Sequence, residues 1–157
     1  MGMHFDIPDH QLRDRDAREH RIRIWWTAYI LDRTCASKVG MPVTIQDDII
    51  LVSLPSDEDL ENREDFGIAE YTLQSIALAR LAAGSIRSIY SRRKHDKSFS
   101  QRVQSALKDL TKWMGSLSLE LQLGEKGTTI KLPDRVIFLH LRFNQACYPH
   151  RQPVPHC

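Results

Sequence analysis

The stretch RIRIWWTAYILDR, residues 21–33, brings two of the three tryptophans together between paired arginines and an aspartate. Its large apolar residues recur at the spacing of one face of an α-helix: Ile22, Trp25, Trp26, Tyr29 and Ile30. Ile24, Ala28 and Leu31 are expected to widen this apolar stripe. The stretch therefore predicts an amphipathic helix that buries one side.

The aromatic residues of this stretch allow two interpretations. Trp25, Trp26 and Tyr29 could stack on the bases of a single-stranded nucleic acid, with Arg21 and Arg23 on the phosphates. The three aromatic residues also lie on the apolar stripe, and aromatic residues at helical spacing are more often buried in a core. We therefore predict that they form the interior of a helix bundle, and nucleic-acid stacking remains the alternative.

Charged side chains flank the aromatic residues. For Arg21, Arg23, Asp32 and Arg33 we predict a network of structural ion pairs, within or between helices, rather than a catalytic group. Glu19 and Arg23 carry opposite charges four positions apart, which indicates a solvated helix face.

The composition is that of one globular domain without a marked charge. Hydrophobic residues make up 41% of the 157 residues, and 22 lysines and arginines against 20 acidic residues give a net charge of +2. This balance lacks the basic excess typical of phosphate-binding proteins. The three cysteines lack the spacing of a disulfide framework or a zinc module, and they fit a reducing, intracellular compartment. No apolar run approaches the ~20 residues of a membrane span, and no secretory signal is evident.

Proline, glycine and charge predict where the first helix begins and ends. Pro8 and Asp9 offer a start, and Gly40 with Pro42 offers an end. Residues 41–65 have no helical period, so we predict a loop that packs on the helices and leads into a solvated acidic turn.

Three further helices are predicted. Residues from about 64 to 90 indicate a long, mostly buried helix, in which Gly84 and its small neighbours indicate close helix packing. A third helix ends at Gly124 and carries the most regular apolar seam of the chain: Val103, Leu107, Leu110, Met114, Leu117 and Leu121. Pro133 and Asp134 open a fourth. The predicted fold class is all-α, an irregular bundle of about four main helices with a long packed loop after the first.

Several groups of residues have side chains that could bind a metal or a nucleic acid, but none has the arrangement of a convincing site. Asp47 and Asp48 could hold a divalent metal in a small all-α enzyme or ligand-binding protein, but carboxylates in such a bundle must converge from facing helices. Near the C-terminus, four residues of the types that bind zinc occur at a spacing that is unusual for a zinc site: Cys147, His150, His156 and Cys157. The basic run SRRKH, residues 91–95, is more often a solvated loop than a nucleic-acid contact. We predict no catalytic residue, metal ligand or cofactor in this chain, because no known catalytic or phosphate-binding motif occurs in it.

A set of positions within residues 2–55 resembles a known family in order and spacing. The set consists of Gly2, His4, Glu19, Arg21, Arg23, Trp25, Trp26, Tyr29, Leu31, Asp32, Arg33, Ser37, Gly40, Pro42, Ile45, Asp48, Ile49, Leu54 and Pro55. The pattern is similar to the fungal-specific transcription factor domain, the middle homology region of fungal zinc-cluster transcription factors. The likeness is weaker over residues 56–146, and Met41 stands where the family commonly has an arginine.

The resemblance implies an all-α regulatory domain that follows an N-terminal binuclear zinc cluster, the module that reads DNA. Such a cluster needs six closely spaced cysteines, so neither zinc nor a DNA-binding residue is carried over to this chain. By this resemblance, residues 1–147 form a partial regulatory domain that begins inside the family's domain. Residues 148–157 are expected to form a divergent, disordered tail.

The resemblance further implies a nuclear regulator of transcription rather than an enzyme. The expected partners are other segments of a full-length regulator or proteins of the transcription machinery, with a small-molecule effector as a further candidate. Neither DNA nor a membrane is an expected partner. Asp32, Arg33 and the loop from Met41 to Pro55 lie where the family likeness is strongest, and we expect them to transmit the state of the domain to DNA-binding and activation segments.

Overall fold

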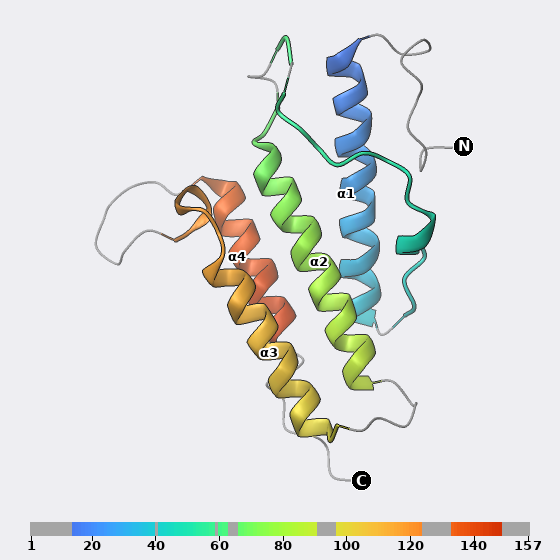
Figure 1. The fold of residues 1–157 in the computed structure, drawn as a ribbon, viewed down its shortest axis with the longest axis vertical. Helices are drawn as coiled ribbons and strands as arrows, with labels where there is room; N and C mark the ends of the chain where they lie inside the picture. Colours follow the sequence, from blue (N-terminus) through green and yellow to red (C-terminus); the bar gives the residue numbers. More distant parts are fainter. Residues whose placement is uncertain are drawn as a thin grey trace. The chain divides into compact units, whose positions relative to one another are not determined.

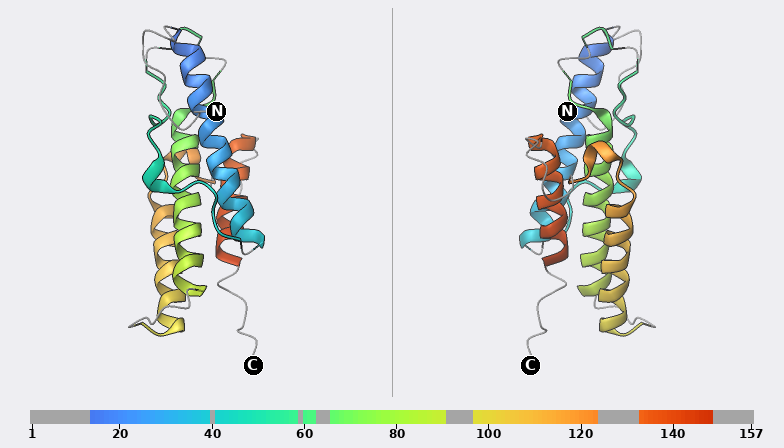
Figure 2. Two further views of the ribbon diagram at one scale, coloured as in Figure 1. Left: turned by 90° about the vertical axis from the view of Figure 1, so that its right-hand side faces the viewer. Right: turned by 90° about the vertical axis from the view of Figure 1, so that its left-hand side faces the viewer.

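The computed structural model describes residues 14–39, 41–58, 60–62, 66–90, 97–123 and 133–148. Within these ranges the elements are α1 (Arg15–Val39), η1 (Asp47–Ile49), α2 (Ala69–Tyr90), α3 (Phe99–Gly115), η3 (Leu119–Leu121) and α4 (Asp134–Cys147), where η marks a short 3-10 helix. Their helical courses can be followed in Figures 1 and 2. The predicted all-α class is confirmed.

The chain divides into two compact units, and the boundary falls within α2. Met1–Ala79 form the first unit, and Arg80–Cys157 form the second. Among the described residues, no helix is long and apolar enough to cross a membrane.

In the first unit, α1 begins later than the sequence predicted. Its first residue is Arg15, because the Asp14 carboxylate accepts a hydrogen bond from the backbone N–H of Ala17 at 3.0 Å and so caps the helix. At the other end, the N–H of Met41 donates to the carbonyl of Ala36 at 3.0 Å. This i to i−5 bond is typical of a helix C-terminus. Pro8, Asp9 and Gly40, which were predicted to begin and end the helix, lie outside the described residues.

The predicted apolar stripe of α1 lies in the core of the first unit. Its residues are joined there by residues of α2 and of the segment between the helices: Ile22, Trp25, Trp26, Tyr29, Ile30, Val52, Ile76 and Ala79. Trp25 and Trp26 meet edge to face, with ring centroids 4.8 Å apart. The interpretation of the aromatic residues as core is thereby confirmed, and the burial of both indoles argues against the nucleic-acid alternative.

The expected widening of this stripe is wrong. Ile24 and Leu31 are 59% and 50% exposed, and Ala28 is also exposed. Successive residues of an α-helix are about 100° apart, so these three positions lie on the side of α1 opposite Ile22. The buried face of α1 is therefore narrower than its apolar composition indicates.

In the second unit, α3 begins as a capped helix and ends early. The side chains and backbones of Ser98 and Gln101 bond reciprocally in a capping box. The predicted end at Gly124 is wrong, because α3 ends at Gly115, where the Ser116 hydroxyl donates to the carbonyl of Trp113 at 2.8 Å. Gly124 itself lies outside the described residues. Glycine and serine favour helix termination, so α3 ends before the last two residues of the predicted apolar seam, Leu117 and Leu121.

The core of the second unit combines α3, η3 and α4. Buried residues of these elements and of the link between α3 and η3 include Leu110, Trp113, Leu117, Leu121, Val136 and Leu139. Trp113 stacks on Phe143 with 6.0 Å between ring centroids, and a ring nitrogen of His140 lies 2.9 Å from the carbonyl of Leu121. Helix α4 begins at Asp134, directly after Pro133, as predicted.

Gly84 of α2 does not mark close helix packing. A Cβ atom built at this position would meet no heavy atom within 4 Å, and the residue is exposed. The prediction that small residues here bring two helices together is therefore wrong, and the space beside Gly84 is open.

Two isoleucines of α1 test which face of the helix is buried. Ile22→Ala is expected to lower the free energy of unfolding by about 2–5 kcal/mol, because Ile22 is 6% exposed and truncation leaves a cavity. Ile24→Ala, the same change on the exposed face, is expected to alter it by less than about 0.5 kcal/mol. Urea unfolding of the 157-residue chain followed by circular dichroism measures both. Equal losses from the two variants would contradict this orientation of α1.

Candidate functional site

The segment between α1 and α2 is bound along α1 by polar contacts. We call residues 41–62 the connecting segment, of which 41–58 and 60–62 are described. Taken in order along the connecting segment, the contacts join Asp32 to Thr44 and Ile45, Arg33 to Asp47, Trp26 to Ser53, Arg23 to Asp57, and Asp16 to Glu61 and Asn62. Apart from the adjacent residues Asp32 and Arg33, residue numbers fall along α1 as they rise along the segment. The connecting segment therefore runs antiparallel to α1 over most of its length (Figure 1).

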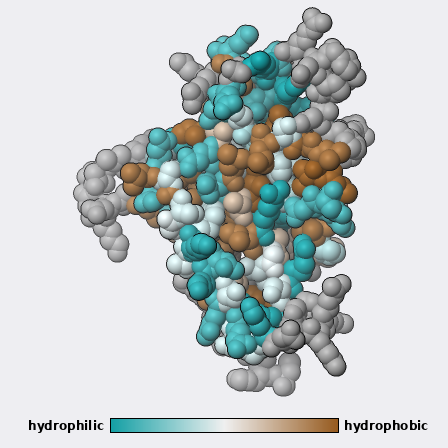
Figure 3. All heavy atoms as spheres, in the orientation of Figure 1, coloured by the Kyte–Doolittle hydropathy of each residue, from teal (hydrophilic) through white to brown (hydrophobic). Residues whose placement is uncertain are grey.

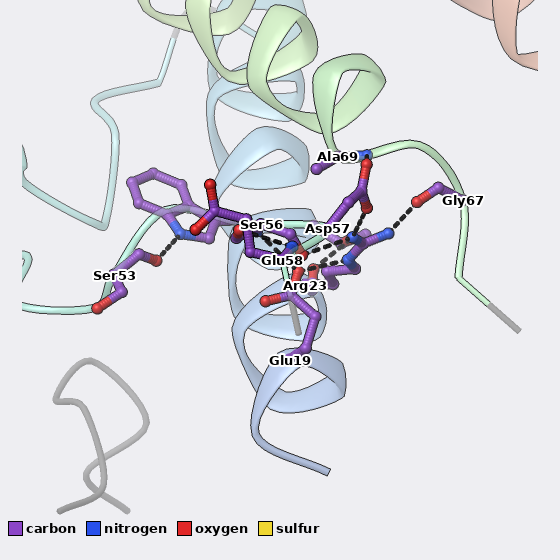
Figure 4. Close-up of polar contacts among 10 residues, drawn as sticks. Glu19, Arg23, Ser53, Ser56, Asp57, Glu58, Gly67 and Ala69 are labelled. Carbon is purple, nitrogen blue, oxygen red and sulfur yellow. Dashed lines mark hydrogen bonds and ion pairs between the residues drawn. The ribbon is translucent and has the colours of Figure 1, made fainter. Parts of the chain in front are cut away.

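Arg23 is the centre of the largest group of these contacts (Figure 4). Its Nε donates to Glu19 Oε1 at 2.5 Å, and its Nη2 donates to Asp57 Oδ1 at 2.7 Å and to the Ser56 carbonyl at 3.2 Å. Its Nη1 donates to the carbonyl of Gly67. Glu19 Oε1 also accepts the backbone N–H of Ser56 at 3.2 Å. One guanidinium thus joins α1, the connecting segment and the approach to α2.

The carboxylate of Asp57 connects this group to the start of α2. Its second oxygen, Oδ2, accepts the backbone N–H of Ala69 at 2.9 Å. A carboxylate at this position satisfies an N–H that has no partner within the helix, and it interacts favourably with the positive end of the helix dipole. Helix α2 accordingly begins at Ala69 and not near residue 64 as predicted.

Two predictions about charge in this region are wrong. Glu19 and Arg23 do form an i, i+4 ion pair, but Glu19 is 6% exposed because the connecting segment covers it, so their face of α1 is not solvated. Asp57 was assigned to a solvated acidic turn, whereas its side chain pairs with Arg23 and caps α2. The contacts of Glu19 with Ser56 and of Arg23 with Asp57 join residues more than thirty positions apart, and a local charge pattern does not reveal such pairs.

A second group of contacts surrounds Arg33, which is 2% exposed. Its guanidinium carbon lies 3.6 Å from the centroid of the Tyr29 ring, a cation–π contact. Its Nη2 donates to Asp47 Oδ1 at 2.9 Å, and the Tyr29 hydroxyl donates to the same oxygen. Nη1 has no hydrogen-bond partner and lies 3.8 Å from Asp32 Oδ2. The buried charge of Arg33 is thus compensated mainly by Asp47 and the aromatic ring.

Asp32 binds the first part of the connecting segment. Its carboxylate accepts the backbone N–H groups of Thr44 and Ile45, each at 3.1 Å. Burial raises the pKa of this carboxyl, but the bonds from Ile45 and Thr44 and the charge of Arg33 outweigh it and hold the pKa below its ordinary value. The ionised carboxylate is therefore the form that fastens this part of the segment to α1.

Asp16 binds the last part of the connecting segment. Its oxygens accept the backbone N–H groups of Glu61 and Asn62, each at 3.0 Å, and the Asn62 side chain at 2.8 Å. Burial raises the pKa of Asp16, yet these bonds lower it below its ordinary value. The sequence analysis did not single out Asp16. Its spacing of three from Glu19 and seven from Arg23, which puts all three on one face of α1, is the signal that could have found it.

The candidate site residues differ in what their side chains contact. Arg23, Asp32 and Arg33 bind the connecting segment, whereas Trp25, Trp26 and Tyr29 form the core. Of the aromatic residues, Trp26 and Tyr29 also bind the segment, through the carbonyl of Ser53 and the carboxylate of Asp47. Arg21 is half-buried, Pro42 and Asp48 are exposed, and Gly40 lies outside the described residues.

The metal alternative at Asp47 and Asp48 is not supported. Within the described ranges no group of three or more histidine, cysteine, aspartate or glutamate side chains could hold a metal ion. Asp47 instead pairs with Arg33 and Tyr29. The basic run at residues 91–95 and three of the four candidate zinc ligands of the tail, His150, His156 and Cys157, lie outside the described residues.

Sequence comparison identifies the family. The family model of the fungal specific transcription factor domain matches residues 1–125. The chain belongs to this family. The resemblance inferred from the spacing of Glu19, Arg23, Trp25, Trp26 and their neighbours is thereby confirmed.

Curated relatives of the chain are regulators of transcription. An uncharacterised transcriptional regulatory protein of Schizosaccharomyces pombe is 24% identical over 142 residues, which cover 90% of this chain and 18% of the relative. The transcriptional activator protein acu-15 of Neurospora crassa is 30% identical over 118 residues, 69% of this chain and 13% of the relative. Cutinase transcription factor 1 alpha of Fusarium vanettenii is 38% identical over 71 residues, 45% of this chain and 8% of the relative. These names point away from an enzyme.

The region of likeness is a small part of each relative. The chain spans no more than 20% of the length of the curated relatives that it matches. No solved structure matches the chain.

Removal of the Arg23 side chain tests the central group of contacts. Arg23→Ala leaves the carboxylates of Glu19 and Asp57 without their cation in a partly buried place, so we expect a loss of about 3 kcal/mol in the free energy of unfolding. Lys38→Ala, which removes an exposed cation of the same helix, is expected to cost less than about 0.5 kcal/mol. Urea unfolding at pH 7 compares the two variants. Similar small losses from both would show that the contacts of Arg23 do not fasten the segment.

The lowered pKa of Asp32 predicts a pH dependence. A carboxyl whose pKa is lower in the folded state stabilises the fold above its ordinary value of about 3.9, and this contribution is lost as pH falls through the lowered pKa. Asp32→Asn is therefore expected to destabilise the chain at pH 7, and its difference from the native chain should shrink below about pH 4. Asp48→Asn, the same change at an exposed neighbour, serves as control. Unfolding by urea across pH 2.5–7 measures both, and a difference for Asp32→Asn that does not change with pH would contradict the assignment.

Proposed function

We propose that this chain is part of the regulatory region of a fungal transcription regulator, and that it works in the nucleus through contacts with proteins. In this proposal it neither catalyses a reaction nor reads DNA, and it holds no cofactor of its own. The observation that carries the proposal is the family match over residues 1–125, together with relatives named as transcriptional regulators.

The geometry of the first unit supports a role as a scaffold. Arg23 and Arg33, the basic residues of the family pattern whose contacts are described above, direct their side chains at partners within the same unit. Asp32 likewise binds backbone N–H groups of the connecting segment. Side chains engaged in this way hold a fold together, and none of these three has the arrangement of a nucleophile beside a base.

The connecting segment is the part of this scaffold that we propose carries regulatory contacts. Between its anchors it exposes Ile49, Leu51 and Leu54, each more than half exposed. Figure 3 shows apolar residues, in brown, reaching the surface on the side where η1 lies. Exposed apolar residues of this size favour a protein partner. We propose another segment of a full-length regulator as that partner, with proteins of the transcription machinery and a small-molecule effector as alternatives.

In this proposal, the binding of a partner is transmitted to α1 through the charged side chains that hold the connecting segment. Asp32 and Arg33 are adjacent in sequence and bind successive parts of the connecting segment, Thr44 and Ile45 on one side and Asp47 on the other. A partner that binds the exposed apolar residues can displace the segment only by breaking these charged contacts. Coupling of this kind requires that the segment have two arrangements with different affinities for the partner.

A tethered reporter assay tests the proposal. The 157-residue chain is inserted between a heterologous DNA-binding module and an activation segment in a fungal reporter strain, and an unrelated all-α domain of similar size in the same position is the reference. We expect reporter expression to differ several-fold between the two fusions at equal protein levels. Leu51→Ser, on the exposed part of the connecting segment, should remove the difference, whereas Leu119→Ser, on an exposed part of η3, should keep it.

The same strains separate regulation from folding. Asp32→Ala and Arg33→Ala are expected to change reporter expression in the same direction as Leu51→Ser when strains with equal protein levels are compared. Reporter expression equal to that of the reference domain for the native chain and for every variant would overturn the proposed function. Loss of protein without any separate change in regulation would show that Asp32 and Arg33 serve the fold alone.

A further inference from the structure

Helix α4 exposes an apolar face in the second unit. Val136 and Leu139 are buried in the core of that unit, whereas Ile137, Phe138 and Leu141 are 41%, 57% and 50% exposed. The solvent side of a surface helix is normally polar, and a group of large exposed apolar side chains marks a place where another protein binds. Besides its core side, α4 therefore has a second apolar side that is open to solvent.

Two opposite charges stand at the ends of this exposed face. Asp134, Phe138 and Arg142 follow one another at intervals of four residues, so their side chains lie in one row along the helix. Asp134 is exposed and Arg142 is partly exposed. The eight positions between the two charged residues correspond to about 12 Å along the helix axis, so the charges are too far apart to pair with each other. We call Asp134, Ile137, Phe138, Leu141 and Arg142 the outer face of α4.

The row of Asp134, Phe138 and Arg142 is complementary to its own reverse. If two copies of α4 lie antiparallel about a twofold axis at Phe138, Asp134 of each copy lies opposite Arg142 of the other, and the two Phe138 rings meet between them. An interface between two identical chains related by a twofold axis requires such a self-complementary surface. A parallel arrangement would instead place like charges opposite each other, which is unfavourable. The charges therefore favour a second copy in the antiparallel orientation.

We propose that the outer face of α4 binds the same face of a second copy of this chain, with the two helices antiparallel. Ile137 and Leu141 lie beside the central Phe138 and extend the apolar contact. The antiparallel orientation also places the positive end of each helix dipole beside the negative end of the other. One short helix face from each copy buries less than the roughly 1,200–2,000 Å² typical of a stable complex, so the dimer is weak. The inference does not depend on the proposed role in transcription.

Sedimentation equilibrium of the 157-residue chain measures this association, with a reducing agent present to exclude disulfide-linked dimers. We expect an average mass near that of the monomer at about 1 μM and close to twice that value at roughly 500 μM. High salt should weaken the dimer, because its charge pairs lie at the edge of the contact. A mass that stays at the monomer value at every concentration, in a chain that circular dichroism shows to be folded, would overturn the proposal.

Charge reversal at the two ends of the row tests the antiparallel orientation. Asp134→Arg leaves two basic groups in the row and Arg142→Asp leaves two acidic groups, so each variant alone should associate at least about tenfold more weakly than the native chain. An equimolar mixture of the two variants should associate about as strongly as the native chain, because every charge then faces its opposite. Native-like association of either variant alone, or no association in a mixture of the two folded variants, would overturn the proposal.

A pair of apolar substitutions tests the centre of the interface without a change of charge. Phe138→Ala should weaken association at least about tenfold, because the two rings meet at the twofold axis. Since Phe138 is 57% exposed, the variant should stay folded. Leu119→Ala, which removes an apolar side chain of η3 that is 86% exposed, should associate within about threefold of the native chain. Equal association of Phe138→Ala and the native chain would overturn the proposal, and this comparison holds even if a charge variant fails to fold.

Discussion

The arrangement of the first unit depends on the guanidinium of Arg23. It binds two carboxylates and two backbone carbonyls, and these partners come from α1, the connecting segment and the residues before α2. A cation held among partly buried carboxylates is tolerated only when its pairs are complete, so the contacts require one arrangement of these three parts. The Asp57 carboxylate extends that requirement to the first N–H of α2. The side chain of Arg23 thereby joins the connecting segment to α1 and to the residues before α2.

This arrangement gives the sequence pattern of the family a physical meaning. Trp25, Trp26 and Tyr29 form the apolar interior, whereas Arg23, Asp32 and Arg33 bind the segment that covers the same helix. Trp26 and Tyr29 do both, since their polar atoms bond to Ser53 and Asp47 while their rings are buried. The pattern that identifies the family is therefore largely a description of how α1 holds the connecting segment. The regulatory role of these residues stays a prediction.

Local periodicity predicted the features that depend on neighbouring residues. The helical spacing of Ile22, Trp25 and Tyr29 predicted the buried stripe, and Pro133 predicted the start of α4. The spacing of apolar residues did not predict the width of the buried face of α1 or the end of α3. The apolar residues Ile24 and Leu31 are exposed, and Leu117 is buried although the helix has already ended.

The polar contacts of the connecting segment could be predicted only in part. The sequence indicated that charged residues of α1 form ion pairs, but it did not identify Asp57 and Asp47 as the partners of Arg23 and Arg33. Those partners lie 34 and 14 positions away, in a stretch without helical period. Acidic residues in such a stretch resemble a solvated turn until the fold brings them to α1. The open space beside Gly84 was missed for a related reason, because a glycine in a helix fits both close packing and a cavity.

Hydrogen exchange of individual backbone amides tests most directly whether the connecting segment is fastened along α1. The amides of Thr44, Ile45 and Ser56 donate to carboxylates of α1, so we predict that they exchange far more slowly than unstructured peptide in the folded native chain. Asp32→Ala should remove protection at Thr44 and Ile45 and leave it at Ser56. Exchange of all three amides at the rate of unstructured peptide, in a chain whose α1 amides are protected, would contradict the claim that charged residues of α1 hold the connecting segment.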